Sequence, residues 1–272
     1  MSAAVTTRSP SLIGVAYTIW HKHMRKFLGN GEELFGTMIQ PVLWVGLFGV
    51  GMKSLMGAAA VEGGSSYVGF MLPGIVALSA MGGAIGGGMA WLDERVRGVV
   101  KEYLVAPIPR VSILLGNAGS TLSKALVQAV VIFVVGLLLG AQLSADPLGW
   151  LTGLALLVGY SLGFTGLALL VASKTDDLMA YHAMIMLLNL PVLFLSNALY
   201  PMASLPGWMR IGALVNPTSY LVDGLRRTTL ADGGLAGADL LPLWLCLTVT
   251  TAFAALGLAV ATRAFAAKTA RS

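Results

Sequence analysis

The sequence predicts an all-α polytopic membrane protein with six transmembrane helices, from its composition and from the spacing of its charges. Of the 272 residues, 57% are apolar and 11% are charged, whereas an average soluble domain has about 25% charged residues. Six runs of 19 to 32 residues carry no charge at all. About 20 apolar residues cross a ~30 Å hydrocarbon core as a helix, which satisfies its own backbone hydrogen bonds. We therefore expect spans at about 34–52, 67–91, 117–140, 148–172, 179–200 and 240–262.

The whole chain, 1–272, is expected to form a single transmembrane domain with both termini on one side, because the number of spans is even. The first 33 residues lack the short apolar stretch and the small-residue cleavage site of a signal peptide, so we expect the amino terminus to stay cytoplasmic. The single cysteine, Cys246, lies in the last apolar run. It excludes an intrachain disulfide and is expected to be a small buried core residue.

The basic residues indicate the orientation. With both termini cytoplasmic, 13 of the 17 Lys and Arg residues fall on the inner side, which is the positive-inside pattern. The four outer ones are Lys53, Arg210, Arg226 and Arg227. The formal net charge of +5 then reflects membrane insertion and attraction to anionic lipid, so membrane lipid is an expected partner and nucleic acid is not.

An amphipathic helix is predicted before the first span, over about 10–29. Apolar side chains recur there at helical spacing while basic ones occupy the other faces. The apolar residues are Ile13, Tyr17, Trp20, Met24 and Phe27. This pattern is typical of a helix that lies in the membrane interface. We expect an elbow helix that turns into the first span.

A second amphipathic helix is predicted in the longest cytoplasmic loop, at about 93–105. Its apolar stripe follows the i, i+3, i+4, i+7 pattern, and Asp93 with Arg97 forms a favourable i,i+4 pair. Pro107 and Pro109 then end the helix. A short helix with both signs of charge indicates a docking element for a cytoplasmic protein. A solvated helix lying on the membrane is the alternative.

The segment after the fifth span is irregular. Four prolines punctuate it, and several amides and phenols make it more polar than a helix that faces lipid. Irregular backbone at membrane depth survives only where protein or water covers it. We expect residues 201–236 to form a helical hairpin that dips back into the outer leaflet, with an ordinary external loop as the alternative.

The sequence predicts no catalytic, ATP-binding or metal-binding site in this chain. The one hydrolase-like pattern, Gly159 to Gly163, places Ser161 deep in the fourth span, about 18 Å from its inner end, where His182 is too distant to act as a base. The two glycines are better explained as a small-residue packing face. The sequence has no P-loop, no metal-ligand spacing and no ionisable residue near mid-membrane, which an ion-coupled transporter would need.

Two separated motifs resemble a known family. The first runs from Glu94-Arg95-Val96-Arg97-Gly98 through Glu102-Tyr103-Leu104-Val105-Ala106-Pro107-Ile108-Pro109-Arg110. The second runs from Asn197-Ala198-Leu199-Tyr200-Pro201 through Asn216-Pro217-Thr218-Ser219-Tyr220 to Asp223-Gly224-Leu225-Arg226. In this order they resemble ABC-2 type permeases, in particular the daunorubicin-resistance and nodulation-factor exporters, over nearly the whole chain.

The resemblance implies a partner that supplies energy. Two copies of an ATP-binding cassette subunit would hold ATP and Mg, this chain would bind no cofactor, and a second, identical permease would complete the path. The resemblance assigns coupling to Glu94, Arg95, Arg97, Gly98, Glu102, Pro107 and Arg110. It assigns an external gate to Tyr200, Pro201, Asn216, Pro217 and Tyr220.

The resemblance also implies that the first, second and fifth spans line the path of the transported molecule. On those spans, flexible methionines and a few amides suit amphipathic molecules of varied shape. The candidates are Met71, Met81, Asn189, Phe194 and Asn197. We expect the two asparagines and Phe194 to share one broad face of the fifth span.

The predicted function is the permease of an ATP-driven exporter in a bacterial inner membrane. It would move an amphipathic drug, a lipid or a lipid-linked saccharide outward. The alternatives are a sodium or polysaccharide exporter of the same class, an ion-coupled secondary transporter, and a membrane scaffold that transports nothing.

Overall fold

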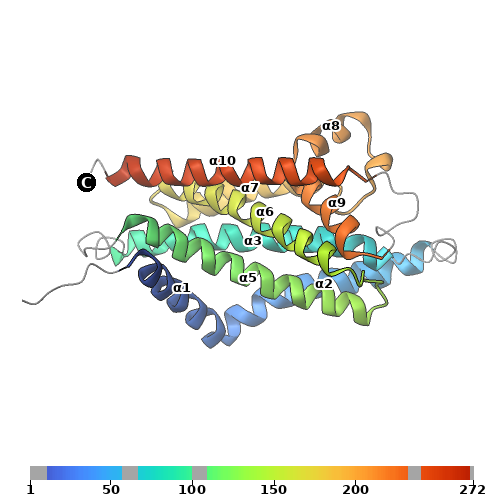
Figure 1. Ribbon diagram of the computed structural model, residues 1–272, viewed down its shortest axis with the longest axis horizontal. Coiled ribbons are helices and arrows are strands. Elements are labelled where there is room, and N and C mark those ends of the chain that lie inside the picture. Colours follow the sequence, from blue (N-terminus) through green and yellow to red (C-terminus); the bar gives the residue numbers. More distant parts are fainter. Residues whose placement is uncertain (1–10, 57–66, 100–108, 232–239, 270–272) are drawn as a thin grey trace, which may run out of the picture.

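The long helices of the chain form a bundle along a common axis (Figure 1). The computed structural model describes residues 11–56, 67–99, 109–231 and 240–269, and these residues contain no β-strand. The helices are α1 (Leu12–Gly29), α2 (Gly31–Met56), α3 (Tyr67–Val96), α5 (Arg110–Leu138), α6 (Pro147–Lys174), α7 (Leu178–Phe194), α8 (Gly207–Val215), α9 (Pro217–Thr229) and α10 (Leu243–Thr269), with one 3-10 turn, η2 (Met202–Ser204).

The predicted all-helical membrane architecture is confirmed. Within the described residues, α3, α5, α6 and α10 are each long and apolar enough to cross a membrane. Helices α2, with 26 residues, and α7, with 17, occupy the positions of the first and fifth predicted spans. The count of six spans stays a prediction, since α7 is about 25 Å long at helical rise and the hydrocarbon core is ~30 Å thick.

Two predicted boundaries are wrong. The fifth span was expected to reach residue 200, but α7 ends at Phe194 and residues 195–200 are turns and bends. Pro191 lies inside this helix and has no backbone N–H to donate. The side-chain amide of Asn216 donates hydrogen bonds to the carbonyls of Val192 and Leu195, which satisfies the end of the helix. Residues 93–96 of the predicted docking helix are instead the last turn of α3. Residues 100–105 of it lie outside the described residues.

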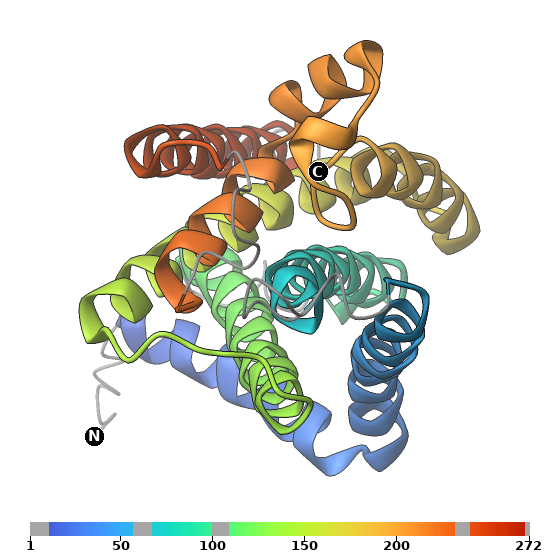
Figure 2. The ribbon, with the colours of Figure 1, turned by 90° about the vertical axis from the view of Figure 1, so that its right-hand side faces the viewer.

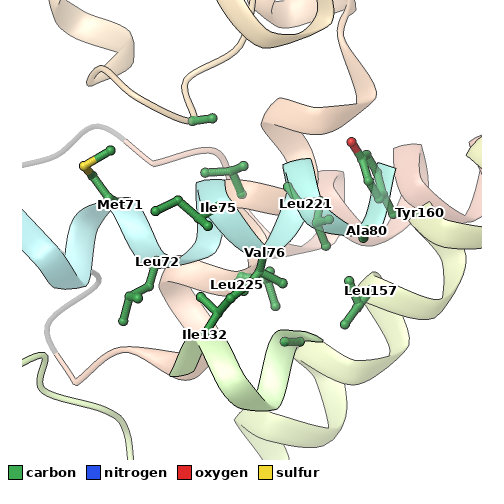
Figure 3. Packing of buried hydrophobic residues seen from close by; sticks show 14 of the residues in the cluster. Met71, Leu72, Ile75, Val76, Ala80, Ile132, Leu157, Tyr160, Leu221 and Leu225 are labelled. Carbon is green, nitrogen blue, oxygen red and sulfur yellow. The ribbon is translucent and has the colours of Figure 1, made fainter. Parts of the chain in front are cut away.

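The core lies around α3, which occupies the centre of the bundle when the molecule is viewed end-on (Figure 2). Apolar side chains of α3 pack against α5, α6 and α9 (Figure 3). The labelled ones are Met71, Leu72, Ile75, Val76 and Ala80 of α3, Ile132 of α5, Leu157 and Tyr160 of α6, and Leu221 and Leu225 of α9. Cys246 of α10 is completely buried, as predicted.

Glycines let α6 and α10 approach closely. A Cβ added at Gly163 would overlap the ring of Phe253, and one added at Gly166 would overlap the carbonyl of Gly257. At Gly159 the nearest neighbour of an added Cβ is a methyl of Thr250, at 3.1 Å. The predicted small-residue packing face is therefore confirmed.

The predicted elbow helix is α1, which lies obliquely at one end of the bundle (Figure 1). Ser11 caps it by accepting a hydrogen bond from the backbone N–H of Gly14, at 3.2 Å. Its apolar residues divide into two sets: Met24 and Phe27 are buried in the protein, whereas Ile13 and Tyr17 are exposed. The helix thus has one apolar side on α5 and a second that is free to face lipid.

Candidate functional site

A cavity of about 440 Å³ lies between α2, α3, α5 and α7, and the end of α1 closes one side of it. Its lining includes apolar side chains, which are Phe27, Trp44, Ile75, Leu78, Met81 and Leu193. It also includes polar side chains, which are Thr37, Gln40, Asn117, Ser120, Thr121, Lys124, Gln128 and Asn189. The cavity therefore suits a molecule with both an apolar and a polar portion.

Glycines of α3 leave the room for this cavity. An added Cβ at Gly82 or Gly86 would meet nothing within 4 Å, so these two residues border open space. The neighbouring Gly83 and Gly87 face α5, where an added Cβ at Gly87 would overlap the hydroxyl of Thr121. Four small residues thus set the width of the space between α3 and its neighbours.

Two charged residues that line the cavity form an ion pair, Lys124 of α5 with Glu33 of α2, whose charged atoms are 2.8 Å apart. The side-chain amide of Gln128 donates to the carbonyl of Thr37 at 3.2 Å. Both bonds hold α2 against α5. The wall carries charges of both signs that cancel, which leaves it polar without an excess of either sign.

The predicted path residues fall in different places. Met81 and Asn189 line the cavity, and Phe194 is half exposed near the end of α7. Met71 is buried in the core. Asn197 does not share a helical face with Asn189, contrary to expectation, because the helix ends before it. It is buried instead, and its amide donates to Asp223 at 2.6 Å.

The first predicted coupling residues lie at the end of α3 and are tied to two other elements. Lys22 of α1 donates to Glu94 at 2.6 Å. Arg95 pairs with Asp176 and also donates to the backbone carbonyl of Thr175, both in the connection between α6 and α7. These contacts connect the end of α3 to the elbow helix and to the connection between α6 and α7.

Arg97 differs from its neighbours because its side chain is 73% exposed. It forms the predicted i,i+4 pair with Asp93 at 2.8 Å. Gly98 follows with a φ of +84°, a conformation that glycine adopts readily and that turns the chain away from α3. Glu102 and Pro107 lie outside the described residues, and Arg110 is the first residue of α5.

His23 of α1 lies beside Glu94, with Nε2 and Oε1 3.9 Å apart, and it lines the cavity. Burial lowers the pKa of this imidazole below its usual value, and the nearby carboxylate opposes that effect only in part. The lowered pKa favours the neutral imidazole at pH 7.

The predicted gate residues organise the helical hairpin of α8 and α9. The Asn216 side chain caps α9 by accepting from the N–H of Thr218 at 3.0 Å, and Pro217 is the first residue of that helix. Tyr220 donates to the carbonyl of Leu214 at 2.6 Å. Tyr200 is exposed, and Pro201 precedes η2. The hairpin is helical as predicted, while residues 232–236 of its expected range lie outside the described residues.

Helix α9 of the hairpin carries a buried charge cluster that the sequence did not predict. Asp223 and Arg226 of α9 are 0% and 1% exposed, and their charged atoms are 3.2 Å apart. The guanidinium also donates to the carbonyls of Phe70 and Asn197, at 3.1 and 2.9 Å, and stacks over the Phe70 ring. An acid three residues before an arginine on one helix was the available signal. From the sequence, Arg226 was assigned to the outer basic residues and to the end of the second motif, without a buried partner.

Comparison with known proteins agrees with this geometry. Residues 15–230 match the ABC-2 type transporter family, which is most of the chain and includes both motifs. The chain belongs to the ABC-2 type transporter family. It is therefore a membrane transport permease, and the cavity lies between helices of a transport domain.

Three relatives illustrate the family. The chain is 32% identical to a protein named as a transport permease, ycf38, of Porphyra purpurea, over 71% of this chain and 66% of the relative. It is 25% identical to the daunorubicin resistance ABC transporter permease protein DrrB1 of Streptomyces coeruleorubidus, over 81% and 77%. It is 24% identical to the inner membrane transport permease YadH of Escherichia coli K12, over 77% and 80%. The matched region thus spans about two thirds of the ycf38 relative.

Proposed function

We propose that this ABC-2 permease is the membrane subunit of an ATP-driven exporter in a bacterial inner membrane, with both termini cytoplasmic. It moves an amphipathic drug, a lipid or a lipid-linked saccharide outward. The observation that carries the proposal is the cavity between α2, α3, α5 and α7, which is lined by both apolar and polar side chains. The relative named for daunorubicin resistance supports a cargo of this amphipathic kind.

Two copies of an ATP-binding subunit, loaded with ATP and Mg, would drive two copies of this permease. Family membership supports this assembly. The exposed Arg97, at the turn after α3, is the described coupling residue best placed to meet the ATP-binding subunit. Glu94 and Arg95 would pass a movement at this turn to α1 and to the connection between α6 and α7, through the ion pairs with Lys22 and Asp176.

The test is export by the assembled complex. The chain is co-expressed with an ATP-binding cassette subunit, and inside-out vesicles are assayed for MgATP-dependent accumulation of daunorubicin and of a fluorescent phospholipid. We expect accumulation that needs ATP and survives collapse of the ion gradients. Accumulation that follows an ion gradient and survives ATP depletion would instead show a secondary transporter.

Coupling is tested in the same vesicles with Arg97→Ala. Loss of one charged partner at an interface costs about 2 to 5 kcal/mol, so transport should fall at least tenfold while the subunits still hydrolyse ATP. The matched control is Arg210→Ala, which removes an exposed arginine of α8 far along the sequence from this turn. Equal transport by both variants would remove Arg97 from the coupling role.

A further inference from the structure

One face of α5 forms a continuous polar stripe along the cavity. Its residues recur at spacings of three and four, which places them on the same side of a helix. They are Asn117, Ser120, Thr121, Lys124 and Gln128, and we call them the polar track. From Asn117 to Gln128 the track covers 12 residues, or about 16 Å along the helix axis.

Two acceptors on this track have no partner within the described residues. The side-chain oxygens Oδ1 of Asn117 and Oε1 of Gln128 are buried and accept no hydrogen bond, although the residues are only 4% and 6% exposed. Such buried acceptors cost free energy unless a partner arrives. Both lie beside the cavity, since an added Cβ at Gly87 or Gly83 would be 3.5 or 3.7 Å from them, and these glycines line it.

The charges of the lining residues restrict which head group could bind here. Lys124 is neutralised by Glu33 at 2.8 Å, so the track has no unpaired positive charge to hold a phosphate or a carboxylate. The unpartnered atoms are both oxygens, which require a donor from the ligand. A hydroxyl group supplies a donor without any charge.

The apolar side chains that line the cavity restrict the rest of the ligand. Trp44 of α2 and Ile75 and Leu78 of α3 line the same cavity. They provide a surface for a hydrocarbon chain or a ring system beside the polar stripe. One amphipathic molecule could therefore contact both kinds of side chain at once.

We propose that the polar track binds the uncharged, hydroxyl-rich head group of an amphipathic molecule, with hydroxyls donating to Asn117 and Gln128. The proposal rests on the proposed function, because it names the chemical class that the transport cavity selects. It places the selecting residues on α5, a helix on which the sequence analysis assigned no path residue.

The test measures binding without ATP or transport. The purified permease in phosphatidylcholine nanodiscs is photolabelled with an alkyl glucoside that carries a diazirine in its chain. Dodecyl maltoside, dodecylphosphocholine and dodecyl phosphate compete below their micellar concentrations. We expect labelled peptides from α2, α3 and α5, and competition at least fivefold stronger by the maltoside than by either phosphate compound. Equal or stronger competition by a phosphate compound would overturn the proposal.

Two kinds of variant sharpen the test. Asn117→Leu and Gln128→Leu should each weaken binding about threefold to tenfold, the value of one hydrogen bond. Gln142→Leu, at an exposed glutamine, is the control. Gly86→Leu should project a side chain into the cavity and weaken labelling, since nothing lies within 4 Å of its added Cβ. Gly46→Leu, which is equally uncrowded and does not line the cavity, should leave labelling unchanged.

The outcomes separate the two proposals. Labelling that is unchanged in the Asn117, Gln128 and Gly86 variants overturns the head-group site, even if the complex exports daunorubicin. Selective labelling that these variants weaken supports the site, even if export proves to follow an ion gradient. Size-exclusion profiles verify that each variant is folded, and the Gly86 and Gly46 pair keeps the test decisive if an amide variant does not fold.

Discussion

At the scale of single residues, we expect the largest effect on stability from Asp223 and Arg226, which are buried together on α9. Asp223 accepts from Asn197 and from the N–H of Leu241, at 2.6 and 3.1 Å. Because every charged atom of the pair has partners, desolvation is compensated only while both are present. The cluster thus ties α9 to the start of α3 and to the turn after α7.

We predict that Arg226→Met destabilises the permease severely. Removing one partner of a buried ion pair leaves an uncompensated charge and costs about 3 to 5 kcal/mol. Asp223→Asn should be destabilising as well, and the double variant should be more stable than the sum of the two effects implies. Thermal melting in detergent, followed by fluorescence-detected size exclusion, provides the measurement. Additive losses would show that the two side chains do not depend on each other.

At the scale of elements, Asn216 joins two helices. Its Oδ1 caps α9, and its Nδ2 donates to the carbonyls of Val192 and Leu195 at the end of α7, at 2.8 and 2.7 Å. A helix end that stops inside the protein needs such partners. This one side chain therefore contributes both to the end of α7 and to the start of the hairpin.

Asn216→Ala should lower stability by more than a helix cap alone, because two carbonyls also lose their donor. A lost cap costs about 1 kcal/mol and each lost hydrogen bond about 0.5 to 1.5 kcal/mol. Asn216→Ser, which can still cap, should fall between the wild type and the alanine variant. Asn30→Ala is the control, since Asn30 caps only the exposed start of α2. If Asn30→Ala lowers the melting temperature as much as Asn216→Ala does, the bonds of Asn216 to the end of α7 contribute nothing to stability.

The contact of α6 with α10 gives a further prediction at this scale. Gly166→Ala should destabilise the protein by about 1 to 3 kcal/mol, the usual cost of overpacking. Its Cβ would overlap the backbone of Gly257, and no change of side-chain rotamer can relieve that overlap. Gly159→Ala should be tolerated better, since it meets a side-chain methyl at 3.1 Å. Melting of both variants in detergent checks this order, and the reverse order would show that α10 is loosely held.

At the scale of the whole molecule, the unequal distribution of 13 and four basic residues predicts the orientation. Single cysteines introduced at Ala3 or Ala270 should react with an impermeant thiol reagent only after the membrane is opened. Cysteines at Ser65 or Gly234 should react in intact cells. The parent chain supplies the background, because its one cysteine, Cys246, is buried. Labelling of both termini from outside would reverse the orientation and place the Arg97 turn on the wrong side for an ATP-binding subunit.

The cavity is also a property of the whole molecule, since α2, α3, α5 and α7 must come together to form it. Figure 2 shows α3 inside the ring of the other helices, where its glycines are able to set the spacing. Substitutions at a single helix can therefore change the cavity without changing the fold. Gly86→Leu, described above, is the sharpest example.

The amino-acid sequence by itself determined the class of protein and its helical architecture. Uncharged runs long enough to cross a membrane satisfy their own backbone hydrogen bonds by forming helices. The periodicity of apolar residues predicted the elbow helix, and the prolines indicated the hairpin. These are local properties, and each can be read within one segment. Both family motifs were likewise evident from the order of residues alone.

Only the tertiary structure decided which polar side chains face the cavity and which hold the fold. Asn189 and Asn197 are the same residue type, yet Asn189 lines the cavity and Asn197 donates to Asp223. They differ because α7 ends between them, where the Asn216 side chain donates hydrogen bonds to the carbonyls at the end of the helix. The polar track on α5 was equally hidden, since its meaning depends on the glycines of α3 that lie across from it. The role of a polar residue inside a membrane bundle depends on the neighbouring helix, and only the packing of the helices supplies that neighbour.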